Sequence, residues 1–126
     1  MIGYVTLGTN DLAKAVAFYD VLLAKVGAGR FMEEDTFVAW AVGPDQPALS
    51  VCKPFDGEVA SVGNGMMVAL KVDSKEIVDA VYAQAMTLGG ADEGLPGLRM
   101  EGFYAAYFRD LDGNKLAVFS SGTGAG

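Results

Sequence analysis

Apolar and polar residues alternate in short runs that predict β-strands. In residues 4–7 the alternation places Val5 and Leu7 on one face of a strand and Tyr4 and Thr6 on the other. Further runs rich in aromatic and branched residues predict strands over 30–33, 37–42, 48–53, 66–72, 104–109 and 115–119. A cluster of Asp, Gly and Asn over 110–114 separates the last two runs, so we expect a hairpin turn there rather than a calcium loop.

Two segments instead carry apolar residues at helical spacing. The first follows the possible N-caps Asn10 and Asp11, stops at Gly27 and has the stripe Leu12, Val16, Tyr19, Leu23 and Val26. The second follows Asp73, which with Glu76 resembles a capping box, and has the stripe Ile77, Val81, Ala85 and Leu88. The sequence therefore predicts two amphipathic helices, each lying between strands.

The second half of the chain repeats the first. A shift of 63 positions superposes the first strands and helices through the pairs Val5–Val68, Leu7–Leu70, Tyr19–Tyr82 and Gly27–Gly90. A shift of 67 superposes the hairpins through the pairs Trp40–Tyr107, Leu49–Leu116 and Val51–Val118. Chance matching is the alternative in so apolar a chain, but the agreement in order and spacing favours a duplicated unit.

Length and composition fit one globular domain. We expect residues 1–126 to form a single domain, with a first module over about 1–55 and a second over about 66–120. A connector rich in Gly and small polar residues joins them over about 56–65, and a short Gly-rich tail ends the chain.

Charge and cysteine content limit the possible partners. The net charge of −7 argues against nucleic acid or an anionic membrane surface as a partner. No apolar run approaches the ~20 residues of a membrane span, and the first residues lack the basic flank of a signal peptide. A single cysteine, Cys52, allows no internal disulfide, so we expect a cytoplasmic protein.

Three stretches resemble the vicinal oxygen chelate superfamily, which includes glyoxalase I, extradiol dioxygenases and bleomycin-resistance proteins. They read YVTLGTNDLAKAVAFYDVLL, GNGMMVALKVDSKEIVDAV and FYAAYFRDLDGNKLAVF, and the last holds a DLDGN turn where the family commonly has DPDGN. The resemblance implies an α+β fold of two βαβββ modules. Their strands would form a curved mixed sheet, a cup that holds a small molecule, with the helices outside. It also implies a homodimer.

The same resemblance implies where a metal would bind. Metal-dependent members place His or Glu at positions that correspond here to Tyr4, Ser50, Met67 and Ala117, none of which is a strong ligand. The chain has no histidine at all, so we expect no family-type metal centre and no cofactor. Two enzymatic alternatives stay open: acid/base catalysis by Tyr4 or Tyr107, and a metal site that uses carboxylates such as Glu33, Glu34, Asp56 or Glu58.

Alternation along the hairpins predicts which side chains line the cup. If both hairpins pair tightly, Trp40 shares a face with Ser50, and Tyr107 shares one with Ala117. The predicted ligand-binding set is Tyr4, Thr6, Trp40, Ser50, Cys52, Met67, Tyr107, Ala117 and Phe119. Arg109 and Lys115 near the mouth fit a solvated rim, which we favour, or a clamp for an anion.

This lining leads to a function hypothesis. A set of aromatic and soft apolar side chains with a few hydroxyls suits a flat or partly apolar small molecule. We therefore expect a metal-free protein of the glyoxalase and bleomycin-resistance type that binds an aromatic or cationic organic molecule. The alternative is a metal-dependent enzyme of the glyoxalase or dioxygenase type with non-standard ligands.

Overall fold

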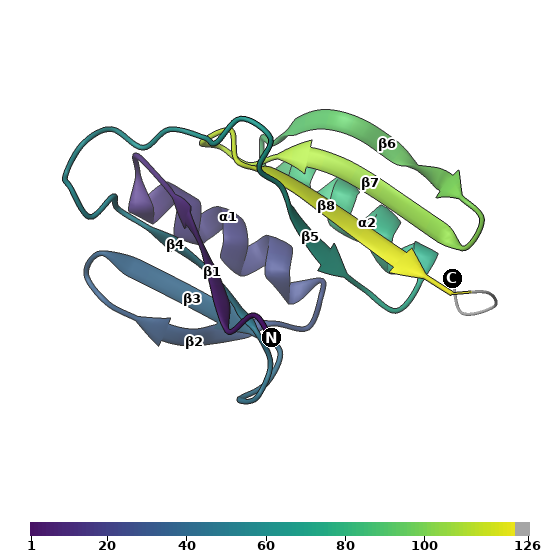
Figure 1. Ribbon diagram of the computed structural model, residues 1–126, viewed down its shortest axis with the longest axis horizontal. Helices are drawn as coiled ribbons and strands as arrows, with labels where there is room; N and C mark the ends of the chain where they lie inside the picture. Colours follow the sequence, from purple (N-terminus) through teal and green to yellow (C-terminus); the bar gives the residue numbers. More distant parts are fainter. Residues whose placement is uncertain (123–126) are drawn as a thin grey trace.

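The computed structural model describes residues 1–122, and the element order βαβββ occurs in it twice (Figure 1). The first unit comprises β1 (Tyr4–Gly8), α1 (Leu12–Ala24), β2 (Gly29–Glu33), β3 (Phe37–Ala41) and β4 (Ala48–Cys52). The second comprises β5 (Val68–Lys71), α2 (Lys75–Thr87), β6 (Ala91–Met100), β7 (Phe103–Arg109) and β8 (Lys115–Ser121). The end of the Gly-rich tail, residues 123–126, lies outside the described residues.

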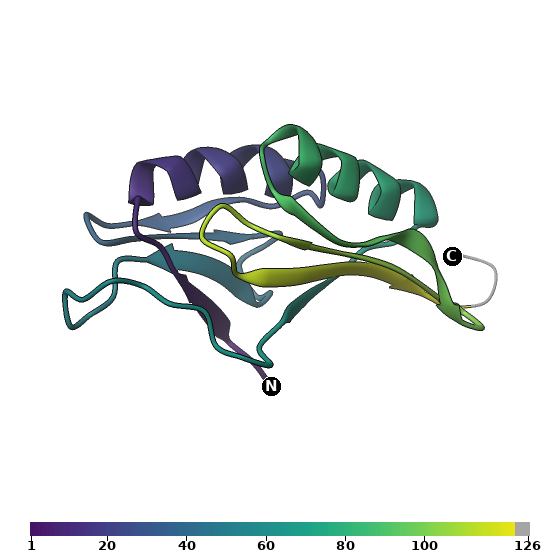
Figure 2. The same ribbon diagram turned by 90° about the horizontal axis from the view of Figure 1, so that it is seen from above.

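Each unit forms its own mixed sheet of four strands. The strand orders are β1-β4-β3-β2 and β5-β8-β7-β6. In the first sheet β1 pairs in parallel with β4, and in the second β5 pairs in parallel with β8. Both helices lie on one side of the two sheets (Figure 2), which leaves an open face on each sheet opposite its helix. The predicted α+β fold is confirmed, with one refinement: the curved sheet is two open sheets rather than one continuous sheet.

The helices begin at side chains that accept hydrogen bonds from the first turn. Asp11, one of the two predicted caps, caps α1 by accepting from the Lys14 amide at 3.1 Å. The cap of α2 is Ser74, which accepts from the Ile77 amide at 3.2 Å, and not the predicted Asp73. The helix begins one residue later than the capping-box pattern implied, so Ser74 occupies the extended position at the helix start.

Strand β6 was not recognised from the sequence pattern. It contains Gly94, Pro96 and Gly97, which are typical of turns, and its side chains are mostly exposed. Its pairing with β7 is interrupted by three register shifts. An irregular edge strand tolerates glycine and proline because its outer side needs no partner, and the apolar alternation used to detect strands is then lost.

The register of the first hairpin differs from the prediction. Ser50 pairs with Ala39, and Trp40 pairs with Leu49. Trp40 therefore points to the helix-covered side of the sheet, where it is 2% exposed, and the prediction that it faces the cup with Ser50 is wrong. The physical reason is loop length: the connection from Trp40 to Leu49 is one residue longer than that from Phe108 to Leu116, and a shift of one residue reverses the face of a strand.

A turn in the second unit clamps the two units together. The Tyr19 hydroxyl on α1 donates to Asp110 Oδ2 at 2.5 Å, and Asn114 Nδ2 donates to the Gly8 carbonyl at 2.9 Å. Asp110 Oδ1 also accepts from the backbone amides of Asp112 and Asn114, each at 2.9 Å, and so closes the turn itself. The predicted hairpin turn is thus confirmed, and buried residues of both units form one hydrophobic cluster beside it.

The clamp predicts an alkaline loss of stability. Burial raises the pKa of Tyr19 well above its ordinary value of 10.0, and the Asp110 carboxylate raises it further. Above about pH 10 the unfolded chain releases this proton while the folded chain keeps it, so the free energy of unfolding falls as the pH rises. Below pH 10 this group adds no pH dependence. Tyr19→Phe should flatten the alkaline decline of the free energy of unfolding by up to about 1.4 kcal/mol per pH unit in urea unfolding series. Equal slopes for wild type and Tyr19→Phe would contradict this assignment.

Candidate ligand-binding site

The open face of the first sheet forms the floor of a hollow of about 1140 Å³. Its floor consists of side chains that alternate with the core residues of β1, β3 and β4, namely Thr6, Ala39 and Ser50. Residues of β2 and of the segments beside β4 form its walls. The volume exceeds that of the common drug-sized pocket, so a small organic molecule fits with room for solvent.

The walls of the hollow expose large apolar side chains to solvent. Phe55 is fully exposed, Tyr4 is 73% exposed and Phe31 is 53% exposed. Met32 and Ile2 add to the same surface, and Phe37, which is half-buried, also lines the hollow. Large exposed apolar patches are uncommon on monomeric proteins and often mark binding surfaces. This surface is therefore suited to contact a ligand or a partner protein.

The floor offers hydrogen-bond acceptors. The Ser50 hydroxyl donates to the Val5 carbonyl at 3.2 Å, and the Thr6 and Ser50 hydroxyl oxygens lie 3.0 Å apart. A serine hydroxyl has one proton, which the bond to Val5 uses, so Thr6 must donate to Ser50. The Thr6 hydroxyl oxygen can then still accept a hydrogen bond, which suits a ligand N–H or O–H group.

The open face of the second sheet carries the other predicted residues. Tyr107 pairs with Ala117, and Phe119 pairs with Ala105, so all four side chains lie on this face by alternation. Met67, immediately before β5, is 44% exposed. Of the predicted set, the hollow brings together Tyr4, Thr6, Ser50 and Cys52, whereas Met67, Tyr107, Ala117 and Phe119 belong to the second sheet.

Sequence reasoning missed several aromatic side chains of the hollow. Phe37 pairs with Cys52 and lies on the same face of β3 as Ala39. The loop between β3 and β4 is one residue longer than the loop between β7 and β8, and this difference would have placed Phe37 on the open face. Phe31 lies on the edge strand β2, and Phe55 follows β4 in a connector. No periodicity in the sequence indicates the position of Phe31 or Phe55.

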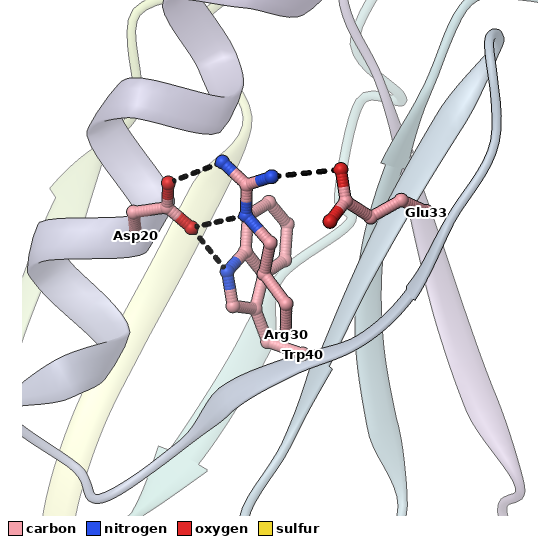
Figure 3. A network of polar contacts seen from close by, with 4 residues as sticks. All are labelled: Asp20, Arg30, Glu33 and Trp40. Atoms are coloured by element: carbon pink, nitrogen blue, oxygen red, sulfur yellow. Dashed lines mark hydrogen bonds and ion pairs between the residues drawn. The ribbon is translucent and has the colours of Figure 1, made fainter.

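Trp40 belongs to a polar network on the helix side of the first sheet. Its indole N–H donates to Asp20 Oδ1 at 2.9 Å, and Arg30 donates to both oxygens of Asp20 at 3.0 and 2.7 Å (Figure 3). Arg30 also contacts Glu33 at 2.8 Å. The hydrogen bonds from Arg30 hold the pKa of Asp20 below its ordinary value. The network fixes the first helix to β2 and β3 and does not reach the hollow.

The chain is similar to proteins of known structure. A solved structure of a glyoxalase/bleomycin resistance protein from Albidiferax ferrireducens T118 matches with a TM-score of 0.90 and 32% identity. The match covers 97% of this chain and 99% of the other. The chain belongs to the glyoxalase/bleomycin resistance family. A scan against protein-family models and a search of curated proteins found no match.

More distant members of the family share the fold alone. A putative glyoxalase from Bacillus halodurans matches with a TM-score of 0.78 and 18% identity over 95% of both chains. A lactoylglutathione lyase from Agrobacterium tumefaciens matches with a TM-score of 0.70 and 22% identity, over 95% of this chain and 92% of that one. At this level of identity, the likenesses show the fold and not a reaction.

The residues of this family member do not fit the family's metal centre. Ser50 and Ala117 lie on the open faces, where a metal ligand would be needed, but a hydroxyl and a methyl group are poor ligands for a transition metal. Within residues 1–122, no three His, Cys, Asp or Glu side chains gather closely enough to hold a metal ion. Glu33, Glu34, Asp56 and Glu58 therefore form no such group of three.

Cys52 is a poor nucleophile in this family member. The thiol is free and half-buried at the edge of the hollow. Desolvation raises the pKa of the Cys52 thiol, so it is protonated at neutral pH. Cys52 thus contributes a soft apolar surface to the hollow.

In the described part of the chain, neither helix has the length and apolar character that crossing a membrane requires.

Proposed function

We propose that this family member binds a small organic molecule, aromatic or cationic, in the open cup without a family-type metal centre. The observation that carries the proposal is the hollow of about 1140 Å³, whose walls expose aromatic and apolar side chains. Bound aromatic rings would remove this surface from water, which provides the affinity. The donor set at the family's metal positions supports the metal-free part of the proposal.

Charge and hydrogen bonding support the choice of ligand class. The acceptor oxygen of Thr6 on the floor suits a ligand with an N–H or O–H group. The net charge of −7 attracts cationic compounds from a distance.

We also propose a homodimer, since edge strand β6 exposes Leu95, Leu98 and Met100, which a second copy would cover.

A neutral aromatic dye tests the proposal directly. N-phenylnaphthylamine should bind wild-type protein saturably, with enhanced fluorescence, because its rings enter the apolar hollow. Phe31→Ser/Phe55→Ser should weaken binding about tenfold, since it removes exposed apolar surface from the walls. Val21→Ser is the matched control, because Val21 is 43% exposed on α1, away from the hollow. Trp40 emission is a poor direct reporter, because Trp40 lies on the other side of the sheet.

Two outcomes would overturn the proposal. One is the absence of saturable binding across a broad panel of aromatic and cationic compounds, followed by calorimetry. The other is stoichiometric transition metal in protein purified without chelators, which would favour the metal-dependent enzyme instead.

A further inference from the structure

The open face of the second sheet is an aromatic platform. Phe103 and Phe119 stack there with ring centroids 5.2 Å apart and planes inclined by 28°. Phe119 lies opposite Ala105, and Tyr107 lies opposite Ala117. Both alanines are almost completely buried, so neighbouring side chains cover them. Aromatic rings thus dominate this face from Phe103 to Tyr107.

Two cations lie at the Tyr107 end of the platform. The Arg99 guanidinium carbon is 5.2 Å from the centre of the Tyr107 ring, and Lys115 Nζ is 5.7 Å from it. Both distances are within the range of cation–π attraction. The Tyr107 ring therefore contacts an arginine of β6 and a lysine of β8.

The backbone of β6 orients Arg99. Arg99 Nη2 donates to the Leu95 carbonyl at 2.6 Å. A Cβ atom at Gly94 would lie 3.2 Å from Nη2, and one at Gly97 would lie 3.1 Å from Nη1. The absence of side chains at the two glycines thus provides the space that the Arg99 guanidinium occupies above the platform. A guanidinium ordered in advance loses less entropy when it binds an anion.

These two cations have no acidic partner in residues 1–122, although the chain has 16 Asp and Glu residues against 9 Lys and Arg residues. Their neighbour Arg109 differs, because it contacts Glu93 at 3.4 Å and donates to the Gly113 carbonyl at 2.8 Å. Arg109 is therefore part of the turn, whereas Arg99 and Lys115 have donors available for a ligand.

We propose that the second sheet binds the anionic group of an amphipathic aromatic ligand between Arg99 and Lys115. The flat body of the ligand stacks on the platform rings, and its carboxylate, sulfonate or phosphate accepts hydrogen bonds from the guanidinium and the ammonium. This inference rests on the proposed function of small-molecule binding and adds a second surface to it, because the residues of the second sheet do not line the hollow of the first. The net charge favours cations at a distance, but the second sheet selects an anion on contact.

A matched pair of dyes tests the inference. Anilinonaphthalene sulfonate carries the naphthyl and phenyl rings of N-phenylnaphthylamine and adds one sulfonate. Arg99→Gln/Lys115→Gln should weaken binding of the sulfonate dye about tenfold and reduce its salt dependence, while binding of the neutral dye stays within about twofold. Lys14→Gln/Lys25→Gln is the control, since it removes the same charge from the first helix and its C-cap.

A second variant keeps the charge and moves only the guanidinium. Gly97→Ala places a methyl group 3.1 Å from Arg99 Nη1 and should weaken the sulfonate dye about threefold with unchanged net charge. Thermal unfolding confirms that each variant is folded.

The outcomes separate the two proposals. If the neutral dye binds but the sulfonate dye does not, the anion site is overturned and the proposed function stands. The same conclusion follows if Lys14→Gln/Lys25→Gln weakens binding of the sulfonate dye as much as Arg99→Gln/Lys115→Gln does. If neither dye binds and the wider panel is also silent, the proposed function fails, and the anion site fails with it.

Discussion

Asp110→Ala should lower the free energy of unfolding by about 3 to 5 kcal/mol, a large part of the total stability of a domain of this size. The Asp110 carboxylate accepts from the Tyr19 hydroxyl, from Asn114 Nδ2 and from two backbone amides of its turn. Tyr19 is fully buried and Asn114 nearly so, and a buried donor left without a partner costs about 1 to 3 kcal/mol. Urea unfolding followed by circular dichroism measures the loss.

Asp112→Ala serves as the control in the same turn. Asp112 accepts from the exposed amide of Asn10 at 2.9 Å, and water can replace that bond. Its loss should stay below about 1 kcal/mol. If Asp110→Ala costs no more than Asp112→Ala, the buried carboxylate does not join the two units as described.

Trp40→Ala should cost about 3 to 5 kcal/mol, the usual loss for removing a large aromatic side chain from a core. Trp40 is 2% exposed, lies 5.7 Å from the Tyr19 ring and donates to Asp20. Chemical unfolding of the variant, followed by Tyr and amide signals, measures the change. Affinity for the neutral dye, measured at a temperature where the variant is folded, should stay within about twofold, because Trp40 does not line the hollow.

Ala39→Leu is the complementary variant. Ala39 is the neighbour of Trp40 along β3, and it lies on the floor of the hollow. The added side chain should occupy part of the ligand volume and weaken dye binding more than Trp40→Ala does. The opposite result, with Trp40→Ala the more harmful to binding and the less harmful to stability, would restore the register expected from the sequence.

Much of the fold could be predicted from local patterns, because strands and helices of this chain bury one face each. Val5 and Leu7 alternate with polar neighbours as a half-covered strand requires, and the stripe around Tyr19 meets the core as expected. The prediction failed where burial does not control the pattern. Strand β6 is an exposed, irregular edge, and its glycines serve the space around Arg99 rather than a turn.

The candidate site was predictable only along regular strands. Thr6 and Ser50 lie side by side because β1 and β4 pair in parallel without interruption, so alternation alone brings them to one face. Trp40 was misplaced because alternation carries no information across a loop whose length changes. Phe31 and Phe55 reach the hollow through tertiary packing of an edge strand and a connector, which no spacing in the sequence encodes.

The longer loop of the first hairpin has a consequence for how a duplicated chain diverges. By similarity alone, Trp40 and Tyr107 are equivalent positions in two copies of one unit. The strand registers instead make Trp40 equivalent to Phe108, because Trp40 pairs with Leu49 and Phe108 pairs with Leu116. Both aromatic side chains are buried, so the inner face of the strand is the same in the two units. A change of length confined to a turn thus lets a duplicated strand keep its buried face while the spacing along the sequence changes.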